Sequence, residues 1–102
     1  MPDPTAVLRD AIEKKLSVSA TYNGYVREMC PHVLGTKKGK QHCFFFQFAG
    51  QSSKGLPAGG EWRCIPLSGL TVHKVYGGPW HTGEGPLEEQ TCVDTVDVQV
   101  AV

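Results

Sequence analysis

The chain has 102 residues with 12 Gly and 7 Pro, which is the size of one domain with one modest core and favours short strands and turns over an all-helical bundle. Ten Lys and Arg residues balance ten Asp and Glu residues, so bulk charge gives no basis for binding duplex DNA. No apolar run approaches the roughly 20 residues that span a bilayer, and the N-terminus lacks the features of a secretory signal, so we expect a cytoplasmic protein without membrane contact.

The first element is expected to be an amphipathic helix. Asp3 is suited to the N-cap position, with Pro4 at the first helical position. Leu8, Ile12 and Leu16 follow at a spacing of four residues, which places them in one apolar stripe. We expect this stripe to cover one side of a sheet.

Two antiparallel strands are expected next. Residues 17–22 alternate between apolar and polar side chains, which is typical of a strand. The dipeptide Asn23-Gly24 is the strongest short hairpin signal, so residues 25–34 should form a second strand beside the first. Within that strand, Pro31 predicts a strand end, a bulge or an edge position.

Three more strands complete the expected sheet. Residues 42–48 are nearly all aromatic and apolar on both faces, which predicts a central strand. A loop over residues 49–60 precedes a strand at 61–67, and a turn at Ser68-Gly69 leads to the strand 70–76. The sequence therefore predicts an α+β, mostly β domain: an N-terminal helix and five antiparallel strands in a strongly bent sheet or a small SH3-like barrel.

Charge divides unevenly along the chain. Residues 5–80 carry all ten basic residues, whereas residues 81–102 carry five acidic residues and no basic one. We expect residues 1–78 to form the folded domain and residues 79–102 to be an acidic extension that covers a basic face, competes with an anionic ligand for it, or carries only isolated surface charges. Alternating valines within residues 92–102 indicate an extra edge strand or a dimer contact.

Four cysteines and four histidines raise the question of disulfides, metals and thiol chemistry. Nothing indicates export, so we expect free thiols. The pairs Cys30/His32 and His42/Cys43 lack the ligand spacing of structural zinc sites, so we expect no metal and no cofactor. Hydrolase, phosphate-loop and zinc-protease motifs are absent, so we expect no enzymatic activity; a thiol or metal enzyme using these residues and Cys64 is a third alternative behind the two given below.

The candidate site consists of polar residues embedded among aromatic ones. Each arginine taken alone is equally well explained as a surface residue with a packed stem. Two guanidinium groups, an imidazole and an amide near several rings nevertheless suit an anion or a nucleobase, because arginine donates paired hydrogen bonds and rings offer stacking. The polar members are Arg27, His32, Gln47 and Arg63, and the aromatic members are Tyr22, Tyr25, Phe46, Phe48 and Trp62.

A series of short motifs extends from Leu8 to Tyr76, about two thirds of the chain. The motifs are a helix ending in Ala-Ile, the strand VSATY, an arginine followed by Pro-His and Leu-Gly, then FFFQFAGQSSKG and finally WRCIPL. In order and spacing they resemble the WYL domain family. The chain departs from the family at residues 43–45, which are Cys-Phe-Phe in place of Trp-Tyr-Leu, and at Pro66 and Gly69 in place of further arginines.

The resemblance implies an SH3-like or Sm-like small β-barrel that senses a ligand, often a nucleic acid or a nucleotide. Together with the aromatic pattern, it predicts a ligand-binding site formed by Tyr22, Arg27, His32, Gln47, Trp62 and Arg63. We therefore expect a non-enzymatic, regulatory binding module for a nucleotide, a single-stranded oligonucleotide or another small anion. The alternative is a protein–protein interaction module or a homodimer assembled through the C-terminal strand.

Overall fold

The computed structural model describes residues 4–51, 60–78, 80–81 and 91–100. These residues contain one helix, six strands and one 3-10 turn: α1 (Pro4–Lys14), β1 (Ser17–Tyr22), β2 (Tyr25–Lys37), β3 (Lys40–Gly50), β4 (Glu61–Pro66), η1 (Leu67–Gly69), β5 (Leu70–Tyr76) and β6 (Thr95–Gln99). The predicted α+β, mostly β class is confirmed. The predicted N-cap Asp3, most of the loop 49–60 and most of the segment after residue 78 up to residue 90 lie outside the described residues.

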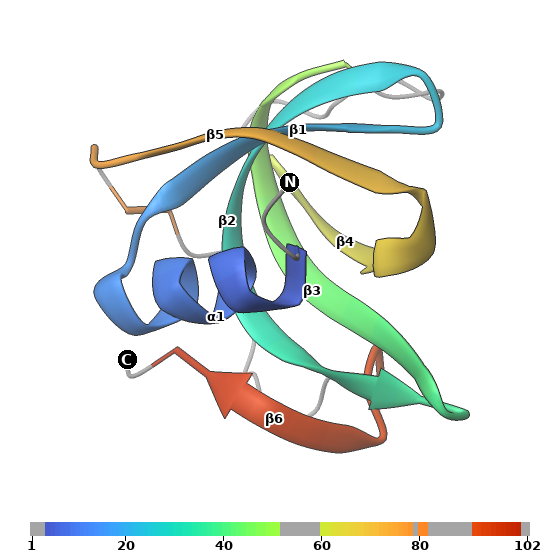
Figure 1. The fold of residues 1–102 in the computed structure, drawn as a ribbon. Helices are drawn as coiled ribbons and strands as arrows, with labels where there is room; N and C mark the ends of the chain where they lie inside the picture. Colours follow the sequence, from blue (N-terminus) through green and yellow to red (C-terminus); the bar gives the residue numbers. More distant parts are fainter. Residues whose placement is uncertain (1–3, 52–59, 79, 82–90, 101–102) are drawn as a thin grey trace.

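The six strands belong to one antiparallel sheet. β4, β3, β2, β1 and β5 follow one another in that order, and β6 pairs with β2 off this path. The long strand β2 changes neighbours along its length, because its first half pairs with β1 and its second half, from residue 33, pairs with β6. Figure 1 shows the sheet bending strongly along β2 and β3, with β5 and β6 at opposite ends of the molecule.

The sheet is not closed into a barrel. In the part of the chain that the structure describes, the outer strands β4 and β5 share no ladder, although η1 connects them. The second half of β2 pairs with the additional strand β6, beyond the point where β1 ends. The prediction of five strands in a closed small barrel is therefore not confirmed, and the observed sheet has six strands and stays open.

Particular residues account for the turns and the irregularity of β2. Asn23 and Gly24 have φ values of 58° and 80°, as a two-residue type I′ turn between β1 and β2 requires. Lys38-Gly39 repeats this pattern between β2 and β3, with φ values of 52° and 79°. The register of β2 against β3 shifts between Pro31 and Val33, so the proline lies at a bulge, where its missing N–H is tolerated.

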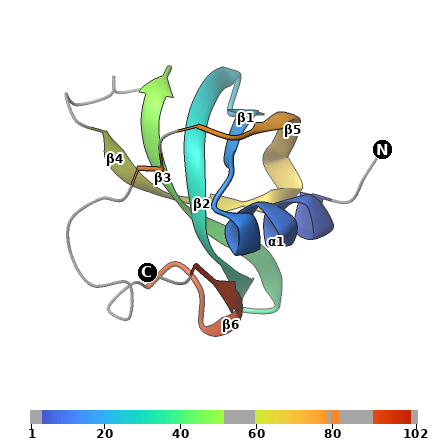
Figure 2. The same cartoon turned by 90° about the vertical axis from the view of Figure 1, so that its left-hand side faces the viewer.

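The core lies between α1 and the bent sheet. α1 packs on β2, β5 and β6 (Figure 2). The helix buries Leu8, Ala11 and Ile12. Phe45, in the interior strand β3, is fully buried. Other buried apolar side chains come from the strands: Val18, Ala20, Met29, Val33, Leu34, Cys43 and Ile65. Among the described residues, no helix has the length and apolar character needed to cross a membrane.

The C-terminal residues 91–100 are joined covalently to β4. Cys64 and Cys92 form a disulfide with their Cα atoms 5.4 Å apart, whereas Cys30 and Cys43 are free and buried. The prediction of free thiols is therefore wrong for one pair. The physical reason is that the two cysteines are 28 positions apart, and only the folding of the sheet brings them together.

Candidate functional site

The six predicted site residues lie on both faces of the sheet. Trp62 and Arg63 are neighbours on β4, and successive strand residues point to opposite faces. The ring contacts of Trp62 are therefore made on one face and the hydrogen bonds of Arg63 on the other. The face that also carries the core holds Tyr22, Arg27, Gln47 and Arg63, and the other face holds His32 and Trp62. The structure does not bring all six together.

Arg27, Gln47 and Arg63 form a hydrogen-bonded group that we call the arginine cluster. Gln47 is fully buried at its centre, and its Oε1 accepts hydrogen bonds from Arg27 Nη1 at 3.3 Å and from Arg63 Nε at 3.2 Å. Its Nε2 donates to the carbonyl oxygens of Ala49 at 3.1 Å and Gln51 at 3.0 Å. One neutral oxygen thus serves two cationic side chains, which come from β2 and β4.

Arg27 is buried in spite of its charge, with 5% of its surface exposed. Its Nη2 donates to the carbonyl oxygen of Tyr22 at 3.3 Å, and its guanidinium carbon lies 5.6 Å from the Tyr22 ring centre and 5.8 Å from that of Tyr25. Desolvation by burial, followed by the charge of Arg63, lowers the pKa of Arg27 below its usual value. The two arginines therefore repel each other in a partly dehydrated environment.

Two nitrogen atoms of the arginine cluster have no acceptor among the residues that the structure describes. Arg27 Nε and Arg63 Nη2 are buried and make no hydrogen bond to any residue that the structure describes. Arg63 Nη1 lies 3.0 Å from the carboxylate of Glu61, which is itself largely exposed. A buried donor without an acceptor is costly, and the cluster has more positive than negative charge. The arrangement is chemically suited to an anion that accepts from both guanidinium groups.

The opposite face carries an aromatic cluster of His32, Phe44, Phe46, Trp62 and Trp80. Trp62 stacks on Phe44 with ring centres 4.6 Å apart and meets His32 and Phe46 edge-on. Trp80 also contacts the His32 ring, at 4.8 Å. Burial lowers the pKa of His32, against the opposing effect of a hydrogen bond between its Nδ1 and the Cys30 carbonyl. His32 is thus a neutral imidazole inside an aromatic cluster at neutral pH.

Three contributors to these clusters, Phe44, Glu61 and Trp80, are absent from the candidate residues that the sequence predicts. Trp80 lies at the start of the expected acidic extension, residues 79–102, and a tryptophan is unusual in a solvated segment, so it is the signal that indicates packing. Glu61 lies two positions before Arg63, so the two-residue period of a strand places both on one face. The same period places Trp62 and Arg63 on opposite faces of the sheet, although the sequence motif WRCIPL contains them as neighbours and the predicted site includes both.

The predicted site residues, all in the described part of the chain, form no metal centre and do not line the cavity that lies beside α1. Within the described ranges, no three His, Cys, Asp or Glu side chains form a group that could hold a metal ion. A half-open cavity of about 300 Å³ lies between the first turn of α1 and β5, lined by Pro4, Val7 and residues 70–75. None of the six predicted site residues lines this cavity.

No family model, no curated protein and no solved structure matches the chain. The resemblance to the WYL domain family therefore stays a prediction from the sequence motifs. The arginine cluster, with two buried donors that no described residue pairs, is the feature of the structure on which a proposal about function can be built.

Proposed function

We propose that the protein is a non-enzymatic binding module whose arginine cluster holds the anionic group of a small ligand, such as the phosphate of a nucleotide or of a short single strand. The observation that carries this proposal is a pair of buried donors, Arg27 Nε and Arg63 Nη2, that find no acceptor in residues 4–51, 60–78, 80–81 and 91–100. An oxyanion that accepts from both would satisfy them and would offset the charge of the two side chains. The rings of Tyr22 and Tyr25 lie beside Arg27 and are suited to stacking with a base.

The proposal extends to the fold, the location and the regulatory role. We propose that the bent sheet is an open variant of the SH3-like or Sm-like barrel of WYL domains and that the protein acts in the cytoplasm. A partner protein there responds to whether the ligand is bound. His32 and Trp62 then support the strands of the site from the opposite face, because their ring contacts lie on the face away from Arg63. The ligand itself contacts the arginine cluster and the neighbouring tyrosines.

Thermal-shift and calorimetric titrations with inorganic phosphate, mononucleotides and short single strands test this proposal. A ligand that binds only the folded state raises the unfolding midpoint by mass action. We expect at least one of these anions to raise the midpoint of the native protein. Arg63→Gln, which changes the less buried arginine, should weaken its binding by about tenfold or more, as expected for loss of a charge-assisted hydrogen bond.

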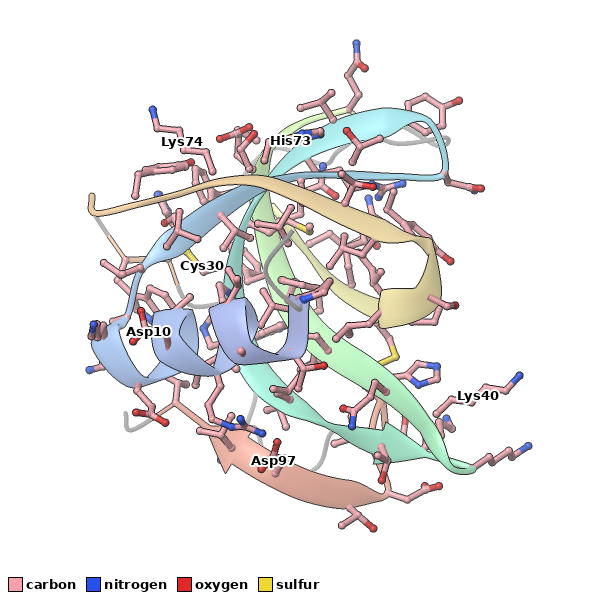
Figure 3. The ribbon with its side chains drawn as sticks, viewed as in Figure 1. Asp10, Cys30, Lys40, His73, Lys74 and Asp97 are labelled. Carbon is pink, nitrogen blue, oxygen red and sulfur yellow. A yellow bond between two sulfur atoms is a disulfide. The ribbon has the colours of Figure 1, made fainter. Side chains whose placement is uncertain are left out.

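The control for bulk charge is Lys40→Gln. Lys40 lies at the tip of the β2–β3 hairpin, far from the arginine cluster, and its side chain projects away from the sheet (Figure 3). The variant removes one positive charge, as Arg63→Gln does, so it should bind the anion as the native protein does. Absence of a shift with every anion, or equal weakening in both variants, contradicts the proposal.

A second candidate function, an interaction module, is favoured by the position of β6. β6 pairs with β2 along one edge, and no strand of the described residues covers its other edge. Val96 on this strand is 47% exposed. A strand of a second copy would extend the sheet at β6. Light scattering should then give the mass of a dimer, and Val96→Lys should reduce it to that of a monomer; a monomeric native protein excludes this candidate.

A further inference from the structure

The Cys64–Cys92 disulfide joins β4 to the segment that contains the last described strand, β6. Cys64 lies on β4 and is exposed, whereas Cys92 precedes β6 and is 3% exposed. The bond therefore connects one outer strand of the main path, β4, with the additional strand on the edge of β2. Residues 91–100, which we call the C-terminal segment, are thus held to the rest of the chain by a bond that a thiol can break.

The side-chain polar contacts of the C-terminal segment lie at the surface, whereas Cys92, Val93 and Val100 of the segment are buried in the core. Lys37 Nζ donates to the Thr91 carbonyl at 2.9 Å, and the backbone N–H of Lys38 donates to Asp94 Oδ2 at 3.2 Å; both contacts are exposed. β6 itself has five residues, of which four are exposed. Short edge strands with exposed contacts are typical of regions that open locally without unfolding of the core.

We propose that Cys64 and Cys92 are a reversible dithiol/disulfide pair, and that reduction of the pair releases the C-terminal segment from β2. The thiolate of a dithiol reductant attacks Sγ of the exposed Cys64, the S–S bond breaks, and its electron pair and a proton go to Sγ of Cys92. The second thiol of the reductant then attacks the mixed disulfide, which leaves Cys64 as a thiol and the reductant as a disulfide. The reverse reaction uses a small disulfide, such as oxidised glutathione, as the oxidant.

Release of the segment uncovers one edge of β2. Residues 33–36 of β2 pair with β6 and lie beyond the end of the β1 ladder, which stops at Met29. Two further backbone hydrogen bonds are lost, from Asp94 N to the Thr36 carbonyl at 2.7 Å and from Val100 N to the His32 carbonyl at 2.8 Å. An uncovered strand edge accepts another strand.

The redox state of the pair thus determines what covers this edge of β2. In the oxidised protein the edge belongs to the chain's own β6, and in the reduced protein it is open to a strand from another molecule. Disulfides persist in oxidising surroundings and are reduced by cytosolic thiols, so the pair distinguishes these two conditions. This inference does not depend on the arginine cluster binding an anion.

Hydrogen exchange on the full chain, with and without dithiothreitol, tests the inference. Thiol titration in denaturant first establishes the redox state: Cys30 and Cys43 should react after treatment with oxidised glutathione, and all four cysteines after dithiothreitol. On reduction, the amides of residues 95–99 and 33–36 should exchange faster by about tenfold or more. The amides of the β1–β2 hairpin should exchange as before.

The double variant Cys64→Ser/Cys92→Ser is the control. It should show the exchange pattern of the reduced protein and should not respond to dithiothreitol. If the variant folds poorly, the reduction experiment on the native chain still tests the inference. The inference is overturned if four thiols react after glutathione treatment, if exchange is unchanged on reduction, or if all amides accelerate together, which would make the bond a stabiliser of the whole fold.

Discussion

At Gln47, one amide group connects two cationic side chains with two carbonyl oxygens. Its Oε1 accepts from Arg27 and Arg63, and its Nε2 donates to the carbonyls of Ala49 and Gln51. A carboxylate would pair better with the arginines, but its second oxygen would face the two carbonyls, so an amide is the group that serves both sides. The consequence is positive charge that the cluster does not neutralise, which costs folding stability and which the proposed anion would offset.

Gln47→Leu should destabilise the fold strongly. The substitution removes the acceptor of two buried guanidinium groups and the donor to two carbonyls, with an expected loss of about 3 kcal/mol in the free energy of unfolding. Urea unfolding measures this loss. Gln41→Leu, an exposed glutamine on the same strand, should change the free energy by less than about 0.5 kcal/mol. Equal effects of the two substitutions would mean that the bonds of Gln47 contribute nothing.

His32 should make stability depend on pH. Burial lowers its pKa in the folded protein, while the imidazole of the unfolded chain has its ordinary pKa of about 6.5. The stability contributed by the neutral ring is therefore present above about pH 6.5 and is lost as the pH falls toward the folded pKa, since the unfolded chain takes up the proton first. Each unit of difference in pKa corresponds to about 1.4 kcal/mol.

Urea unfolding between about pH 7.5 and pH 5 checks this dependence, because most carboxylates titrate below that range. His32→Gln should flatten the fall in stability. His42→Gln, which replaces a histidine outside the aromatic cluster, should leave the fall in place. If His42→Gln flattens the curve and His32→Gln does not, the burial of His32 has no effect on the linkage.

Among the elements, those set by local residues are predictable from the sequence. The turn at Asn23-Gly24 and the strand β1, Ser17–Tyr22, follow from glycine placement and two-residue alternation. The lengths of β2 and β3 are harder to predict, because pairing continues through polar residues to Lys37 and Lys40 on either side of their turn. The expected strands end at residue 34 and begin again at residue 42, whereas backbone hydrogen bonding between strands does not depend on side-chain polarity and extends to Lys37 and Lys40.

The long-range pairings are not predictable from local patterns. An alternating valine pattern indicates an edge strand within residues 92–102, but it carries no information that β2 is the partner of β6. The same holds for the Cys64–Cys92 bond and for the meeting of Arg27 with Arg63 at Gln47. These contacts join residues far apart in sequence, so they depend on the order of strands in the sheet.

Gly35 is required for the close approach of β6 to β2. A Cβ at this position would lie 2.1 Å from the carbonyl oxygen of Thr95, so Gly35→Ala must displace β6. We expect faster amide exchange at residues 95–99 with the disulfide intact, and a loss of about 2 kcal/mol in the free energy of unfolding. Gly78→Ala is the matched control, since a Cβ there meets nothing within 4 Å. Similar exchange in both variants would contradict the steric argument.

In the whole molecule, a net charge of zero conceals two regions of opposite sign. In the described residues the acidic C-terminal segment lies against basic ones: Asp97 of β6 pairs with Arg9 of α1, and Asp94 accepts from the backbone of Lys38. The arrangement places the negative charge of the segment on the basic body. Glu84, Glu88 and Glu89 lie outside the described residues, so these contacts concern residues 91–100 alone.

The electrostatic part of this docking should disappear at high salt. The side chains of Arg9 and Asp97 are 43% and 40% exposed, and exposed pairs contribute about 0.2 to 1 kcal/mol. A double-mutant cycle with Arg9→Gln and Asp97→Asn isolates their coupling from other contacts of either residue. We expect a coupling in this range near 0.01 M salt and none near 1 M, where the Debye length has fallen from about 30 Å to about 3 Å. A coupling that persists at 1 M would mean that Arg9 and Asp97 interact through packing and not through charge. The buried Val93 and Val100 would then hold the segment in place.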